Sequence, residues 1–71
     1  MERLPVKSTN IAAVGYDSEL KVLEVEFVNS GAVYQYYGVP AEVYQDLMDA
    51  SSPGRYFSQN IINTYTHARM P

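Results

Sequence analysis

Alternating apolar and polar positions define the clearest element of the chain. The alternation covers Leu23, Glu24, Val25, Glu26 and Phe27. A period of two is typical of a strand with one buried and one solvated face. Val22, directly before this run, is also apolar and breaks the alternation, so we expect a β-bulge there or the end of one face. The pattern predicts a strand that begins near residue 20 and ends at Phe27.

Two further strands flank this one. Residues 11–16 form a run of β-branched and small side chains that ends at Asp17, a turn signal. After Phe27, Asn29-Ser30-Gly31 predicts a chain reversal with Gly31 in the left-handed conformation. Residues 32–37 then read as a third strand. Tight turns between successive strands predict a three-stranded antiparallel meander from residue 11 to residue 37.

Helical spacing begins after Pro40, which suits a first helical turn because its missing N–H would be unpaired there. An apolar stripe follows along one side: Val43, Tyr44, Leu47, Met48 and Ala50. Ser52 followed by Pro53 has the pattern of an N-cap and first helical residue. Phe57, Ile61, Ile62 and Tyr65 repeat at helical intervals beyond it. The sequence predicts helices over Pro40–Ala50 and Pro53–Tyr65.

The order β-β-β-α-α predicts a small two-layer α+β domain with both helices on one face of the sheet. The outer face, with Glu24, Glu26, Gln35 and Tyr37, is expected to lie in solvent. Residues 1–71 form one domain, with mobile tails at 1–7 and 66–71. For the second tail, we consider a frayed end and a short edge strand as alternatives.

Composition excludes several classes of protein. The chain has 71 residues and no cysteine, which rules out disulfides, thiolate zinc sites and thiol catalysis. The N-terminal residues lack the apolar run of a signal peptide, and no segment approaches the ~20 apolar residues of a membrane span. We therefore expect a cytoplasmic protein without membrane contact. The net charge of −3 argues against a general affinity for phosphate backbones.

Residues suited to catalysis are scarce. His67 is the only histidine and lies near the end of the chain. Glu24 and Glu26 share one strand face, as a general acid and base could, but such a pair is more often a solvated face that keeps a sheet soluble. One histidine with scattered carboxylates lacks the spacing of a metal site. We expect no enzyme activity, no metal and no cofactor.

The 7 tyrosines, in a chain with no tryptophan, are the strongest compositional bias. Tyrosine rings fill cores, and they also stack on nucleic-acid bases. Four of them lie on the predicted inner surfaces and are assigned to the core: Tyr34, Tyr36, Tyr44 and Tyr65. Tyr37 lies on the opposite strand face, and Tyr56 lies on the opposite side of its helix from Phe57. Tyr37 and Tyr56 are therefore the candidate exposed contacts.

The start of the second helix is the candidate anion site. A helix N-terminus presents unpaired N–H groups and a partial positive charge. Gly54 permits close approach, and Arg55 adds several donors. The alternative is an ordinary N-cap at Ser52 with a solvated arginine.

With these motifs in place, the chain resembles the KTSC domain family, which is named for a C-terminal segment of some lysyl-tRNA synthetases and also occurs as small bacterial proteins. The resemblance covers nearly the whole chain. It is carried by Ser8, Ile11, Gly15-Tyr16-Asp17, Leu23, Val25, Phe27, Gly31, Tyr34, Tyr36, Val39-Pro40, Ala50, Ser52, Gly54, Tyr56-Phe57, Ile61 and Tyr65. The synthetase context implies RNA binding.

We therefore expect a non-catalytic binding module for single-stranded RNA or another phosphate-bearing ligand. The expected contacts are Ser52, Gly54, Arg55, Tyr56, Tyr37, Lys7 and Lys21. The alternative is a protein-interaction or self-associating module without a nucleic-acid role. In that case the first strand, the third strand or the tail from Thr66 would offer an unpaired edge to another chain.

Overall fold

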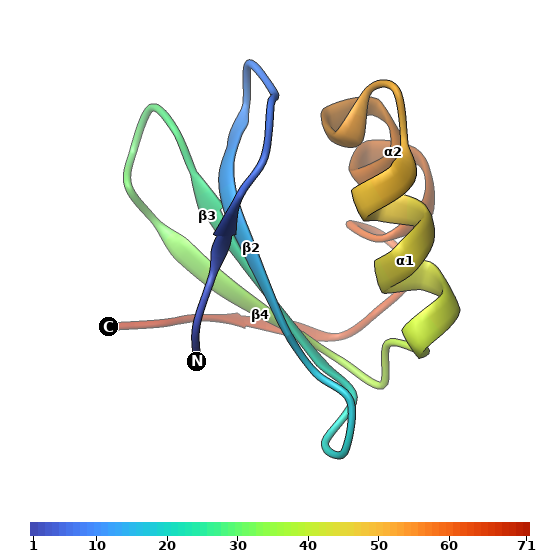
Figure 1. Cartoon of the computed structure of the whole chain (residues 1–71). Helices are drawn as coiled ribbons and strands as arrows, with labels where there is room; N and C mark the ends of the chain where they lie inside the picture. Colours follow the sequence, from blue (N-terminus) through green and yellow to red (C-terminus); the bar gives the residue numbers. More distant parts are fainter.

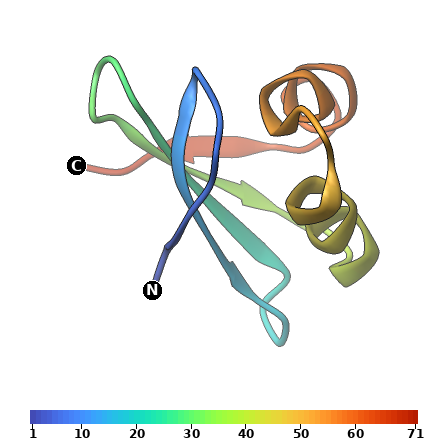
Figure 2. The same ribbon diagram turned by 45° about the horizontal axis from the view of Figure 1, so that its top comes forward.

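The computed structural model describes residues 1–71 as one antiparallel sheet with two helices packed on one of its faces (Figure 1). The five strands lie side by side in chain order: β1 (Leu4–Pro5), β2 (Ile11–Asp17), β3 (Val22–Phe27), β4 (Val33–Tyr37) and β5 (His67–Arg69). The helices are α1 (Ala41–Asp49) and α2 (Pro53–Asn60). Figure 2 shows both helices on the same side of the sheet. The predicted α+β class, antiparallel sheet and two helices are confirmed.

The predicted meander corresponds to β2, β3 and β4, and the sheet extends beyond it at both edges. β1 pairs with β2, and β5 pairs with β4. Both added strands lie in the terminal segments, and β5 matches the edge strand considered for the second tail. The third predicted strand is therefore not a sheet edge, because β5 covers it. A strand of two or three residues is too short to show a period in the sequence.

The core lies between the inner face of the sheet and the helices. Its nine buried residues are Ile11, Val14, Leu23, Val25, Tyr36, Val39, Leu47, Phe57 and Ile61. Aromatic edges and faces join the layers, since the Tyr36 ring meets the Phe57 ring at 5.3 Å in a T-shaped contact. Tyr34, Tyr44 and Tyr65 pack against this core while partly exposed. The core assignment of these four tyrosines is confirmed, most fully for Tyr36.

Most turn and cap residues act as the sequence predicts. Gly31 has a φ of 68° in the turn between β3 and β4, a conformation that costs glycine little. Ser52 caps α2, with Pro53 as its first residue. Pro40, expected in the first helical turn, is instead the extended N-cap residue of α1, and the helix begins at Ala41. Neither α1, with nine residues, nor α2, with eight, reaches the length of a membrane-spanning helix.

Two further local predictions are wrong. α2 ends at Asn60 rather than Tyr65, and turns carry the chain from Ile61 toward β5. Of the two alternatives at Val22, the β-bulge is wrong, because the register shift occurs in β2 between Ile11 and Ala13. Val22 pairs regularly with Tyr37 and Asp17 and is the first residue of β3, so the strand ends there. Ile11 is fully buried in the core, and a bulge can re-aim a side chain in this way.

Gly15, in the middle of β2, lies beneath the N-terminal segment. A Cβ atom built at this position would lie 2.5 Å from the Glu2 carbonyl oxygen and 3.1 Å from the Met1 side chain. Any larger residue would therefore push the segment away from the sheet. The glycine is required for close approach and not for an unusual backbone angle.

We predict that Gly15→Ala destabilises the protein by about 1–3 kcal/mol, the usual cost of overpacking a filled site. Urea unfolding followed by circular dichroism measures the change. Gly31→Ala is the comparison variant, because its Cβ would meet nothing within 4 Å and its cost is confined to the positive φ. A Gly15→Ala protein as stable as wild type would contradict the packing described here.

Candidate functional site

A polar hollow lies where the segment before β2 meets the start of α2. It has a volume of about 690 Å³ and is open to solvent. Its lining contains no large apolar side chain and consists of Lys7, Ser8, Thr9, Asn10, Ser51, Ser52, Pro53, Gly54, Arg55, Ser58 and Gln59. We call it the α2 hollow.

The cap of α2 organises one wall of the hollow. The Ser52 hydroxyl oxygen accepts a hydrogen bond from the Arg55 backbone N–H at 3.4 Å. The Gly54 N–H has no partner within the chain. Ser58 donates its hydroxyl to the Gly54 carbonyl at 3.0 Å. One unpaired backbone donor therefore remains at the positive end of the helix dipole.

The segment before β2 forms the other wall. The Ser8 hydroxyl oxygen accepts hydrogen bonds from the backbone N–H groups of Asn10 at 3.2 Å and Ile11 at 3.3 Å. A Cβ at Gly54 would approach the Ser8 oxygen to 3.2 Å. Glycine at this position thus lets the segment lie directly against the helix start.

The side chains that line the hollow carry positive charge, whereas the whole chain carries a net negative charge. Lys7 and Arg55 line it, and neither forms an ion pair. No carboxylate contributes to the lining, although the chain carries a net charge of −3. Two free cations and a helix N-terminus therefore face the same open volume, an arrangement suited to an anion.

The structure brings together four of the seven predicted contacts: Lys7, Ser52, Gly54 and Arg55. Lys21 lies in the turn between β2 and β3, at the opposite end of the sheet from the segment before β2 (Figure 1). Tyr37 is exposed at the end of β4, where its hydroxyl donates to Gln35 at 3.3 Å. Neither residue reaches the hollow.

Tyr56 does not line the hollow and is only partly exposed, so its assignment as an exposed contact is wrong. Burial, followed by the nearby Asp46 carboxylate and Tyr65, raises the pKa of the Tyr56 hydroxyl. The sequence placed Tyr56 on the opposite side of its helix from Phe57, but it could not show that α1, through Asp46, packs beside Tyr56. Both Tyr56 and Phe57 contact the core.

Sequence reasoning missed the contribution of residues 8–10 and of Ser58 and Gln59 to the hollow. The polar run Ser8-Thr9-Asn10 is visible in the sequence as a helix-cap or turn signal. Its position beside α2 depends on tertiary packing across more than forty residues of chain, which no local pattern reveals.

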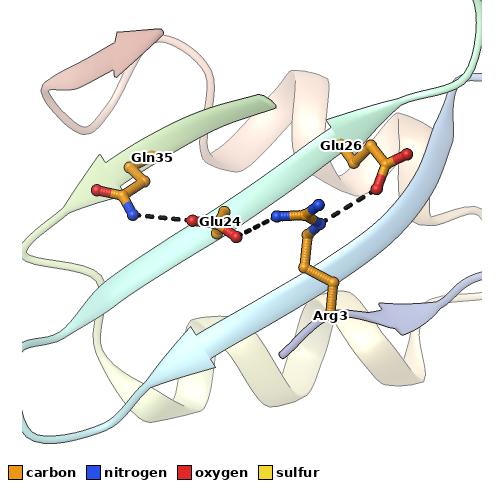
Figure 3. Close-up of polar contacts among 4 residues, drawn as sticks. All are labelled: Arg3, Glu24, Glu26 and Gln35. Carbon is orange, nitrogen blue, oxygen red and sulfur yellow. Dashed lines mark hydrogen bonds and ion pairs between the residues drawn. The ribbon is translucent and has the colours of Figure 1, made fainter. Parts of the chain in front are cut away.

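A second polar cluster lies on the outer face of the sheet (Figure 3). Arg3 pairs with the carboxylates of Glu24 and Glu26, and its Nε lies 3.1 Å from the Glu26 oxygen. Gln35 donates its amide N–H to the other Glu24 oxygen at 2.8 Å. Glu24 is only 5% exposed, so the prediction that it lies in solvent is wrong. We call Gly15, Glu24, Glu26 and Gln35 the arginine seat.

These contacts set the proton affinity of Glu24. Burial acts to raise the pKa of the carboxyl group, but hydrogen bonds from Gln35 and Arg3 and the arginine charge outweigh it. The net effect is a lowered pKa. The bonds to both carboxylates, chiefly that to Glu24, also raise the pKa of Arg3. Glu24 is therefore an ionised, fully paired carboxylate rather than a candidate general acid.

His67 begins β5 and lies beside Tyr36, with 5.1 Å between the ring centroids. It is exposed and forms no ion pair. Its ring packs on the rings of Tyr34 and Tyr36 in the neighbouring strand β4.

Comparison with known proteins identifies the family. The model of the KTSC domain matches residues 7–65. The chain belongs to the KTSC domain family. A crystal structure of a KTSC domain protein from Yersinia pestis superimposes with a TM-score of 0.94 at 37% identity, covering 99% of this chain and 97% of that one. The KTSC match includes all of the residues that line the α2 hollow and the seat carboxylates but not Arg3.

Relatives of two kinds share this domain. An uncharacterized protein of Stutzerimonas stutzeri is 49% identical over 59 residues, which cover 83% of this chain and 82% of the relative. A lysine–tRNA ligase of Nostoc punctiforme is 39% identical over 51 residues, 72% of this chain but 9% of the ligase. The KTSC domain thus forms most of one relative and a small part of the other.

We predict that acid removes stability through Glu24. Because its pKa is lower in the folded state than in the unfolded state, its pairing contributes stability above the unfolded pKa, which is lost as pH falls through the folded value. Glu24→Gln should lower the urea midpoint at neutral pH and flatten its decline in acid. Urea titrations across the acid range test this.

Glu19→Gln is the matched control, since Glu19 is an exposed turn residue without an ion pair. Its midpoint should follow that of wild type at each pH. If the urea midpoint of Glu24→Gln declined in acid as steeply as that of wild type, Glu24 would not be the source of the acid sensitivity.

Proposed function

We propose that this KTSC domain is a non-catalytic cytoplasmic module that binds a phosphate-bearing ligand, single-stranded RNA in the first instance, at the α2 hollow. The observation that carries the proposal is the pairing of two free cations with an unpaired backbone donor. Lys7, Arg55 and the Gly54 N–H border the same hollow, which contains no carboxylate.

Phosphate is the anion that these donors suit best. An arginine guanidinium can offer two parallel N–H bonds to phosphate oxygens, whereas lysine supplies a compact charge. A helix N-terminus adds backbone donors and a partial positive charge. The serine and threonine hydroxyls of the hollow supply further donors without adding apolar surface. The opening to solvent suits a phosphate within a chain, because a polymer must enter and leave the site.

RNA is favoured among phosphate-bearing ligands by the lysine–tRNA ligases that share the domain. A hollow without an aromatic side chain offers no ring for bases to stack on. Binding would therefore depend on contacts to the sugar–phosphate backbone of the RNA and vary little with the RNA sequence. The revised contact set is Lys7, Ser52, Gly54 and Arg55, without the distant Tyr37 and Lys21.

We predict that a short fluorescent single-stranded RNA binds wild type and that binding weakens with salt. The logarithm of the binding constant should fall linearly with the logarithm of salt concentration, by about 0.7 for each neutralised phosphate of a single strand. Arg55→Gln should weaken binding about tenfold, the scale of one charge-assisted hydrogen bond, and reduce the salt slope. Fluorescence anisotropy at several salt concentrations measures both quantities.

Arg69→Gln is the matched control for Arg55→Gln. Lys21→Asn is the matched control for Lys7→Asn, the second variant in the hollow. Each control removes one positive charge away from the hollow. Asparagine is chosen at position 21 because Lys21 has a positive φ of 56°, which asparagine tolerates. Equal weakening in site and control variants would mean that total charge, and not the hollow, determines binding.

Self-association through β5 is the second candidate function. One edge of β5 pairs with β4, and no strand lies on the other. All three residues of β5 are exposed, and an open edge can accept another strand. Light scattering over a concentration series tests this function. A salt-insensitive dimer would favour it, and a monomer at every concentration would exclude it.

A further inference from the structure

The outer face of the sheet holds a specific seat for one arginine. The antiparallel register pairs Leu4 with Val14, so Arg3 lies opposite Gly15. Gly15 pairs with Glu24, and Glu24 pairs with Gln35. Arg3, just before β1, thus forms one row with Gly15 in β2, Glu24 in β3 and Gln35 in β4. The Arg3 side chain extends across β2 to the buried carboxylate of Glu24 (Figure 3). Gly15 leaves room for the backbone of this segment, because a Cβ there would lie 2.5 Å from the Glu2 carbonyl oxygen.

The seat is built to hold a guanidinium. One oxygen of Glu24 accepts a hydrogen bond from Arg3, and the other accepts one from Gln35. Glu26 accepts a hydrogen bond from the Arg3 Nε–H. Tyr37 donates to the Gln35 oxygen, which leaves the Gln35 amide nitrogen to donate to Glu24. The guanidinium thus meets two carboxylates, one of them nearly buried. A lysine would supply the charge but not the planar set of donors.

The segment that fills the seat is weakly attached. Met1, Glu2 and Arg3 form no backbone hydrogen bonds. Only the Arg3 side chain bonds them to the sheet, and that side chain is 31% exposed. Segments with few hydrogen bonds and little burial open more readily than the rest of a fold. Residues 1–3 can therefore leave the seat at a cost set mainly by the Arg3 ion pairs.

The strand that follows is shorter than the edge it protects. β2 has seven residues, and β1 pairs with Ala13 and Val14 only. One further bond joins the Val6 N–H to the Ala12 carbonyl at 3.1 Å. The edge of β2 from Gly15 to Asp17 has no strand beside it. A longer strand at this edge would form more backbone hydrogen bonds than β1 does.

We propose that the β2 edge and the arginine seat form a docking site for an extended, arginine-bearing segment of a partner protein. The partner strand pairs with β2 in place of β1, and its arginine crosses Gly15 to Glu24 and Glu26. Residues 1–3 are then a displaceable cover that occupies the site in its absence. The partner is identified by charge complementarity and by strand addition to a sheet edge, and the proposal does not depend on the α2 hollow.

The proposal predicts competition between the cover and an added peptide. The probe is the capped peptide Thr-Val-Thr-Arg-Leu-Thr-Val, whose central arginine is placed to lie opposite Gly15. The cover is tethered and so competes at a high effective concentration. Arg3→Ala removes its anchor and should tighten peptide binding about tenfold, the scale of one lost charge-assisted bond.

Amide chemical shifts of the full-length protein locate the binding. Supporting changes fall on the backbone amides of Gly15, Tyr16 and Asp17 and on the side-chain amide of Gln35. Arg69→Ala is the matched control, since it removes an arginine from outside the seat and should bind the peptide as wild type does. A peptide with glutamine in place of arginine should lose the gain seen with Arg3→Ala. Adding Glu24→Gln to Arg3→Ala should abolish that gain.

Several results would overturn the proposal. Equal affinity of Arg3→Ala and Arg69→Ala for the peptide would show that residues 1–3 do not cover the site. Equal binding of the glutamine peptide would show that the seat does not select arginine. Dimerisation of Arg3→Ala without peptide binding would assign the edge to a second copy of this chain. If Arg3→Ala fails to fold, Arg3→Lys keeps the charge while weakening the anchor, and the same comparisons apply.

Discussion

The structure depends on one constraint: the apolar residues of this short chain suffice to cover only one face of its sheet. The nine buried core residues all contribute to the layer between the sheet and the helices. No disulfide supplements this layer. A chain of this size buries only roughly 60% of its unfolded surface, so it cannot bury enough apolar surface to build a second apolar layer. The helices must therefore pack on the same face (Figure 2).

The other face is stabilised by polar contacts. A carboxylate in the middle of a central strand would be costly to bury alone. Here Arg3 donates to one oxygen of Glu24 and Gln35 donates to the other. Gly15 lets the segment that carries Arg3 lie close to the sheet. The N-terminal segment is thus part of the fold, although only one side chain bonds residues 1–3 to the sheet. The same arrangement leaves most of the β2 edge without a neighbouring strand.

The start of α2 places the candidate ligand site at the same end of the molecule as the segment before β2 (Figure 1). α1 runs along the sheet and ends at Asp49, and the turn after it brings the N-terminus of α2 against Ser8. Lys7 and Arg55, which are far apart in sequence, become neighbours through this packing. A chain with a net charge of −3 thereby acquires a local site without carboxylates.

Local signals predicted the parts of this fold that depend on local physics. The cap at Ser52-Pro53, the turn at Gly31 and the alternation around Val25 each act within a few residues. The sequence could not show that Glu24 is buried, because an alternating glutamate usually lies in solvent and its partner Arg3 is 21 positions away. It also could not separate Lys7, which lines the hollow, from Lys21, which does not. Both depend on packing between distant segments.

The central claim is that the α2 hollow binds phosphate, and the most direct test is an amide chemical-shift titration of the full chain with a short single-stranded RNA. The account predicts that the largest shifts fall on the backbone amides of Gly54 and Arg55 and on residues 7–10, and that inorganic phosphate shifts the same amides more weakly. The turn that contains Lys21 should remain unchanged. Shifts confined to the outer sheet face or to β5, or no shifts at all, would contradict it.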